Sequence, residues 1–176
     1  MPKIGLTRRK FVALAAPALA GAMPAHSKAR VTPRAAHGEE TMTLTPYLLF
    51  DGSCHDAMQF YHSVLGGELT HTKVKESPAR DHMPAFQQEK TINAHLRSNA
   101  IEISASDWLM PNRTPVRGNT VCLYLSGGAP GDLKSLFQKL SDGADVTDPL
   151  KEMFFGTYGA LNDKFGVRWM FQSNKQ

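Results

Sequence analysis

The stretch T-I-N-A-H-L-R-S-N-A-I-E-I-S-A-S-D, residues Thr91 to Asp107, predicts a β-hairpin with one apolar and one polar face. Apolar side chains alternate with polar ones along both arms, at Ile92, Ala94 and Leu96 and again at Ile101 and Ile103. Ser98 and Asn99 stand between the arms and are typical turn residues. The polar set includes His95 and Glu102, so the hairpin places a base and an acid on one face.

The register of the hairpin decides whether these two side chains meet. If Ser98 and Asn99 are the central pair of a tight turn, His95 lies directly opposite Glu102, with Cβ atoms about 5 Å apart. A three-residue turn would instead place His95 opposite Ile103. If His95 and Glu102 meet, they are either a functional site that shares a proton or a ligand, or an ordinary cross-strand ion pair on a solvent-exposed sheet face.

The N-terminal 29 residues are typical of an export signal. Arg8-Arg9 stand between Thr7 and Lys10-Phe11, an alanine-rich apolar run follows, and Ser27-Lys28-Ala29 is a candidate cleavage site. This resembles a twin-arginine signal, which predicts a periplasmic or secreted protein. Residues 30–41 then form a polar linker and residues 42–176 the folded domain. If translation starts at Met42, the protein is instead cytoplasmic.

The charge balance argues against a nucleic-acid partner. Residues 1–41 carry seven Lys and Arg against two Glu, a net of +5, so the rest of the chain holds −1 of the total of +4. A nucleic-acid-binding domain needs a basic surface on its folded part. No second long apolar run follows the leader, so we expect no membrane contact beyond the export signal.

The two cysteines do not follow a zinc or thioredoxin spacing. Cys54 falls in the first turn of a predicted helix, where the helix dipole could lower its pKa, and Cys122 falls in a predicted strand. We expect no disulfide between them, because the twin-arginine route exports proteins that have already folded in a reducing compartment.

The order of predicted elements repeats along the chain. A strand over 44–50 precedes a helix over 54–65, which Ser53 can cap and Gly66-Gly67 end. A strand over 68–75, a loop over 76–90 and the hairpin follow. After a connector over 108–117, the pattern returns as a strand at 119–126, a helix at 130–140, and strands at 144–147, 156–161 and 167–172. The chain therefore predicts two modules, at about 42–107 and 118–176.

Three segments carry a family resemblance. They are T-P-Y-L-L-F-D-G-S-C-H-D-A-M-Q-F-Y-H-S-V-L-G-G-E-L (45–69), S-A-S-D (104–107) and F-G-T-Y-G-A-L-N-D-K-F-G-V-R-W-M (155–170). They resemble the PhnB-like branch of the vicinal-oxygen-chelate superfamily, with the glyoxalase, bleomycin-resistance and dioxygenase fold. The resemblance implies an α/β (α+β) fold of two βαβββ modules, whose mixed sheets form a cup for a small ligand, frequently with a metal.

The resemblance also implies where a divalent metal would bind. Family enzymes take ligands from the first and last strands of each module, and these places fall near Pro46 and at Glu102, Thr120 and Met170. Only Glu102 is a competent ligand for a hard metal ion. A histidine that this branch often carries is replaced by Asn93, while His95 stands two residues later on the same strand face. The usual ligand set is therefore not intact, and His95 with Glu102 is the remaining candidate.

Alternation predicts the lining of the cup. Besides His95 and Glu102, ligand-binding positions are expected at Asn93, Thr120, Cys122, Tyr124, Arg168 and Met170. Such a lining suits a ligand with an apolar body and an anionic or carbonyl end.

Three functions remain open at this point. Glu102 paired with His95 could act as a general base beside a carbonyl, both could be ligands of a metal-dependent lyase or dioxygenase, or the cup could sequester a drug-like molecule without turnover. An apolar cluster over 108–110 fits either a homodimer contact or packing on the core.

Overall fold

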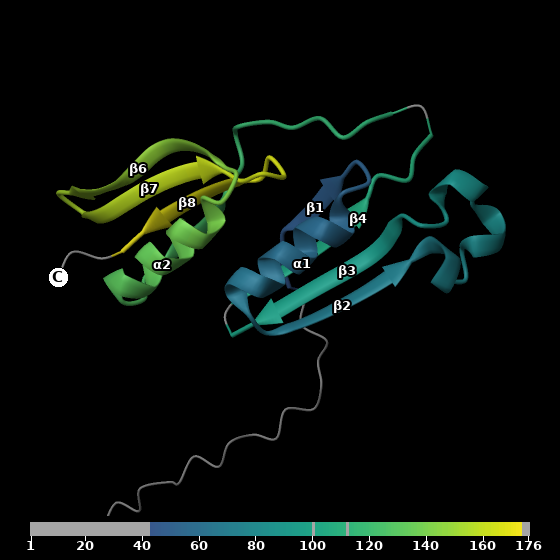
Figure 1. Cartoon of the computed structure of the whole chain (residues 1–176), viewed down its shortest axis with the longest axis horizontal. Coiled ribbons are helices and arrows are strands. Elements are labelled where there is room, and N and C mark those ends of the chain that lie inside the picture. The colour runs from purple at the N-terminus through teal and green to yellow at the C-terminus, as the bar shows by residue number, and fades with distance from the viewer. Residues whose placement is uncertain (1–42, 100, 112, 174–176) are drawn as a thin grey trace, which may run out of the picture. The chain divides into compact units, whose positions relative to one another are not determined.

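The computed structural model describes residues 43–99, 101–111 and 113–173. The predicted export signal and linker lie outside these residues, and export stays a prediction. The described chain folds into two βαβββ modules, each a four-stranded mixed sheet with one α-helix (Figure 1). No helix in the described ranges has the length and apolar character needed to span a membrane.

The first module has strand order β1-β4-β3-β2. Strand β1 is parallel to β4, and the other neighbours are antiparallel. Its elements are β1 (Tyr47–Phe50), α1 (Cys54–Leu65), β2 (Glu68–Lys73), β3 (Thr91–Ser98) and β4 (Ile101–Asp107). Three short 3₁₀ helices follow β2. Val74–Glu76 replaces the end of the strand predicted over 68–75, and Arg80–His82 and Ala85–Gln87 lie in the predicted loop over 76–90.

The second module repeats this arrangement with strand order β5-β8-β7-β6. Its elements are β5 (Leu123–Ser126), α2 (Pro130–Leu140), β6 (Asp145–Met153), β7 (Gly156–Asn162) and β8 (Arg168–Gln172). Both predicted helices have the observed bounds. The predicted strand at 119–126 is shorter than expected and the one at 144–147 is longer, because pairing with β8 and β7 sets their lengths and local propensity does not.

The helix-facing sides of both sheets share one hydrophobic core. It joins α1 residues such as Met58 and Tyr61 to Phe137 of α2 and to Trp169 of β8. The Tyr61 hydroxyl donates to Asp163 Oδ2 over 2.7 Å, and the Trp169 indole N–H donates to the same oxygen over 2.8 Å. Burial and the neighbouring Asp163 raise the pKa of Tyr61, so its hydroxyl keeps the proton that it donates. A buried carboxyl group thus connects the two modules.

The start of α1 differs from the prediction. Ser53 occupies the N-cap position but its side chain makes no capping hydrogen bond. Instead the Cys54 amide donates to Asp107 Oδ1 over 3.0 Å, and the Thr91 amide donates to Asp107 Oδ2 over 2.8 Å. Asp107 therefore caps the helix from the end of β4, a long-range contact that local sequence does not show.

Cys54 does not have the lowered pKa that its place in the first helical turn could give it. Its side chain is fully buried, and burial, followed by the charge of Asp107, raises the pKa of the thiol to about 12. Desolvation of the thiolate outweighs the helix dipole here. Both cysteines are free.

Candidate functional site

The site lies on the face of the first sheet that is turned away from α1. Ala94 and Leu96 of β3 and Ile103 of β4 pack in the core. Their neighbours His95, Glu102 and Ser104 consequently point to the opposite, open face, because side chains alternate along a strand.

The predicted register of the hairpin is wrong, because the observed partner of His95 lies two residues further along β4 than expected. His95 lies opposite Ser104, and Glu102 lies opposite Arg97. Ser98 still belongs to the strand, where it pairs with Ile101 and donates its hydroxyl to the Leu65 carbonyl over 2.7 Å. Asn99 takes the left-handed φ of 49° that asparagine tolerates in turns. The contact between Ser98 and the end of α1 therefore shifts the turn by one residue.

His95 and Glu102 nevertheless meet, as diagonal neighbours. Nε2 of His95 lies 3.3 Å from Glu102 Oε1, and Nδ1 lies 3.0 Å from the Ser104 hydroxyl oxygen. Arg97 Nη2 lies 3.4 Å from the same Glu102 oxygen. The imidazole is thus held at both nitrogens, between a hydroxyl and a carboxyl group, an arrangement through which a proton can pass.

The two side chains remain accessible to a ligand. The side chain of His95 is 29% exposed and that of Glu102 is 37% exposed. A hollow of about 200 Å³ over this face is lined by Glu68, Thr70, His95 and Arg97. This volume suits a small group and is less than a drug-sized ligand fills.

The donor set does not fit the metal that the fold family implies. The described residues contain no group of three His, Cys, Asp or Glu side chains that could hold an ion. At the one remaining pair, Arg97 Nη2 lies 3.4 Å from Glu102 Oε1, the same oxygen that faces His95. A second cation at this oxygen would be repelled, so we derive no step through a metal.

The other predicted ligand-binding residues do not converge on this pair. Asn93 is exposed on the same face of β3, and Thr120 is exposed outside any strand. Cys122 Sγ lies 3.1 Å from Met170 Sδ, and the Tyr124 hydroxyl donates to Gln172 Oε1 over 2.9 Å. These contacts belong to the second module.

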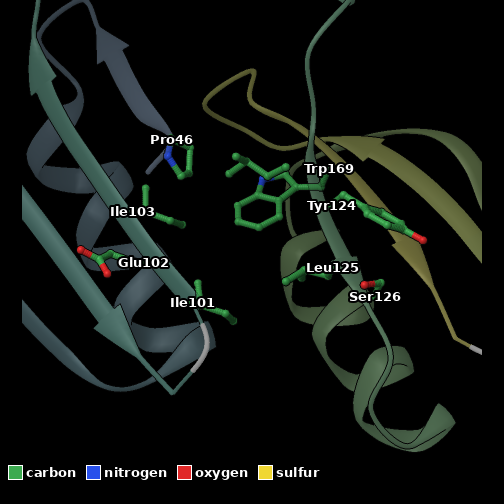
Figure 2. Close-up of a pocket in the computed structure, with 9 residues that line it drawn as sticks. Pro46, Ile101, Glu102, Ile103, Tyr124, Leu125, Ser126 and Trp169 are labelled. Atoms are coloured by element: carbon green, nitrogen blue, oxygen red, sulfur yellow. The ribbon is translucent and has the colours of Figure 1, made fainter. Parts of the chain in front are cut away.

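Glu102 and Tyr124 border a gap of about 370 Å³ between the modules, and this gap is not a polar cup. Ile101 and Ile103 face Leu125 and Trp169 across it, while the carboxyl group of Glu102 and the hydroxyl of Tyr124 point away on opposite sides (Figure 2). The reason is the shared core: because the helix-facing sides of both sheets are joined, their open faces turn away from each other.

Sequence reasoning missed the largest of these three hollows. A cavity of about 560 Å³ lies where β1, the connector and the start of β8 meet, and Arg168 is the only predicted site residue in its lining. The missed lining residues include Tyr47, Trp108, Arg113 and Arg117. The available signal is R-T-P-V-R at 113–117, which places two arginines in a segment that periodicity identifies only as a connector.

Comparison with protein families places this geometry in a known group. Residues 43–171 match the family model described as Glyoxalase/Bleomycin resistance protein/Dioxygenase superfamily. The chain belongs to this superfamily. The two βαβββ modules expected from the sequence are its fold, and that prediction is confirmed.

Individual relatives agree with this assignment. The protein YjdN of Escherichia coli is 30% identical over 145 residues, which cover 77% of this chain and 97% of YjdN. The crystal structure of PA1353 from Pseudomonas aeruginosa is 29% identical with a TM-score of 0.69, covering 77% of this chain and all of that one. A PhnB protein of Bacillus cereus, named a putative 3-demethylubiquinone-9 3-methyltransferase, is 23% identical with a TM-score of 0.59, covering 75% and 99%. This last similarity shows the fold alone.

Proposed function

We propose that this protein binds a small molecule against the open face of its first sheet and that His95 and Glu102 move a proton beside a carbonyl group. One observation supports this most: the His95 imidazole is held between Ser104 at 3.0 Å and Glu102 at 3.3 Å while remaining partly exposed. A general acid or base must be positioned within hydrogen-bond reach of its partners and still reach the substrate.

The contacts suggest how the roles divide. Oε1 of Glu102 faces both His95 and Arg97, and no hydrogen bond to Oε2 occurs within the described ranges. In the proposed step Oε2 accepts a proton from the carbon beside the carbonyl, and the C–H electron pair moves into the enolate. The exposed Arg97 guanidinium is the charged donor on this face that can stabilise the enolate oxygen.

Proton exchange in deuterium oxide tests this step directly. Phenylpyruvate is a suitable probe because it carries exchangeable protons beside a carbonyl, an apolar ring and an anionic end. We expect the protein to accelerate loss of the benzylic proton signal in NMR spectra, and His95→Gln or Glu102→Gln to lower the acceleration by about a hundredfold. His82→Gln and Glu152→Gln, two exposed positions elsewhere, are matched controls that should change nothing. Equal exchange by wild type and both site variants would contradict the proposal.

Binding without turnover is the second candidate. The cavity of about 560 Å³ favours it, because this volume lies in the range of pockets that hold drug-sized molecules. The two candidates differ in one result: a sequestration protein binds its ligand but gives no exchange above the buffer rate.

We further propose that two copies associate through their open sheet faces. Tyr47 is 53% exposed and Leu49 is 43% exposed on the first sheet, and Tyr124 is 51% exposed on the second. Large apolar side chains on one face of a sheet are typical of a covered surface. Sedimentation velocity should give about twice the monomer mass, and Leu49→Arg should shift the protein to monomer. A concentration-independent monomer for the unmodified chain would contradict this.

A further inference from the structure

The cavity between β1, the connector and the start of β8 concentrates positive charge. Arg113 and Arg117 come from the connector and Arg168 from the first position of β8. Within the described residues no acidic side chain lines the cavity, and none of the three guanidinium groups forms an ion pair. Like charges gathered around one hollow repel each other unless an anion occupies it.

The nearby acidic group is not available to balance these charges. Asp163 lies beside the cavity wall, since its carbonyl accepts the amide of Gly166, a lining residue, over 2.8 Å. Its side chain is buried and already accepts four hydrogen bonds, from Tyr61, Trp169 and the amides of Phe165 and Val167. The arginines therefore keep their capacity to bind a ligand.

Most of the other lining side chains are apolar or aromatic. Tyr47, Leu49, Val121 and Trp108 are among them. The indole N–H of Trp108 is buried without a hydrogen-bond partner among the described residues. A buried donor without a partner is costly, and a ligand acceptor in the cavity is one way to satisfy it.

The wall that carries Trp108 is held in place from behind. The Trp108 amide donates to the Phe50 carbonyl over 2.6 Å, and the buried Gln87 side chain donates to the Leu109 carbonyl over 2.9 Å. The loop between β2 and β3 thus supports the start of the connector, so this wall is already formed before any ligand binds.

We propose that this cavity binds small molecules that combine an anionic group, a carboxylate, phosphate or phosphonate, with an apolar body. Planar guanidinium groups bind such oxyanions with paired hydrogen bonds, and the aromatic lining accepts the apolar part. The volume of about 560 Å³ lies in the range of small-ligand sites.

This inference rests on the proposed function, because the cavity adjoins the open face that carries His95. Tyr47 of the cavity is paired with Ser104, and Ser104 is paired with His95 on the next strand. Two strand spacings amount to about 10 Å, which is within the length of a small ligand. A molecule whose anionic group lies about 10 Å from its reacting carbonyl can bind at the arginines and still reach the His95–Glu102 pair.

Calorimetric titration with phenylphosphonate tests the cavity, because this probe has the charge and the ring but no exchangeable proton beside a carbonyl. We expect saturable binding that weakens about tenfold or more in Arg113→Gln and in Arg168→Gln and that weakens with added salt. Arg80→Gln is the matched control, since Arg80 pairs with Asp81 and lies outside the cavity lining. Benzyl alcohol, a neutral probe with the same ring, should bind much more weakly and without salt dependence.

The outcomes separate the two proposals. If phenylphosphonate binds no better than benzyl alcohol, or if the cavity variants match Arg80→Gln, the anion site is refuted even where His95-dependent exchange is found. If phenylphosphonate binds through Arg113 and Arg168 while phenylpyruvate shows no exchange, the anion site stands and the proton-transfer proposal fails. Melting curves of each variant show whether a loss of binding is a loss of fold, and retained binding in Arg113→Lys would confirm that the charge is what matters.

Discussion

The open faces of the two sheets have the same architecture but different chemistry. In the first module, His95, Glu102, Arg97 and Ser104 form a contiguous set of ionisable and polar groups. In the second, the corresponding face holds a Tyr124–Gln172 hydrogen bond and a Cys122–Met170 sulfur contact. The duplicated fold therefore keeps its strand order while the His95–Glu102 pair lies on the first module, and the chemistry that we propose is expected there.

The buried carboxyl groups differ between the modules as well. Asp107 accepts two backbone amides within the first module, whereas Asp163 accepts two amides, the Tyr61 hydroxyl and the Trp169 indole. Of these two carboxyl groups, Asp163 is the one that connects the second module to α1. We therefore expect the shared core to depend on the hydrogen bonds of Asp163 to Tyr61 and Trp169.

The largest expected effect follows from that difference. Asp163→Ala leaves four donors without a partner and should lower the free energy of unfolding by about 4 kcal/mol, against about 2 kcal/mol for Asp107→Ala with two such donors. Urea denaturation of both variants measures the difference. Equal losses, or a larger loss for Asp107→Ala, would show that the shared core does not depend on Asp163.

A smaller effect distinguishes the single cysteine of each module. Cys54 is fully buried with a pKa raised to about 12, while Cys122 is only partly buried. At pH 8 iodoacetamide should therefore alkylate Cys122 at least about tenfold faster in the native protein, because the thiolate is the reactive species. Mass spectrometry of the two peptides gives both rates, and in urea the rates should become similar. Native labelling of Cys54 at the rate of Cys122 would contradict the burial of α1's first turn.

Local periodicity was sufficient to predict most of the fold. Both helices follow from apolar spacing with a clear stop, as at Gly66 and Gly67, and the element order that defines two βαβββ modules follows from alternation. The hairpin register could not be predicted, because it depends on the Ser98 hydroxyl reaching the Leu65 carbonyl, 33 residues away in sequence. The Asp107 cap of α1 was hidden for the same reason, because its partners Cys54 and Asp107 are 53 positions apart in the sequence.

The site was predictable only in part. Alternation placed His95 and Glu102 on one face, and a diagonal contact brings them within 3.3 Å despite the wrong register. Alternation could not show that the two open faces turn apart, since that depends on how the helices share a core. Nor could it show that the connector arginines line a cavity, because irregular segments have no period from which a facing direction can be inferred.

The double-mutant cycle of His95→Gln and Glu102→Gln, measured as benzylic proton exchange of phenylpyruvate, tests most directly whether the first open face carries the chemistry. If the two residues act as one unit, each single variant loses about a hundredfold in protein-catalysed exchange and the double variant is scarcely worse than either. Glu152→Gln, on the second sheet, should exchange like the unmodified protein. Two results would contradict this account: small losses of exchange in the single variants that simply add, or a loss in Glu152→Gln as large as that in Glu102→Gln. In either case the His95–Glu102 pair is an ordinary solvent-exposed ion pair, and the two faces do not differ in function.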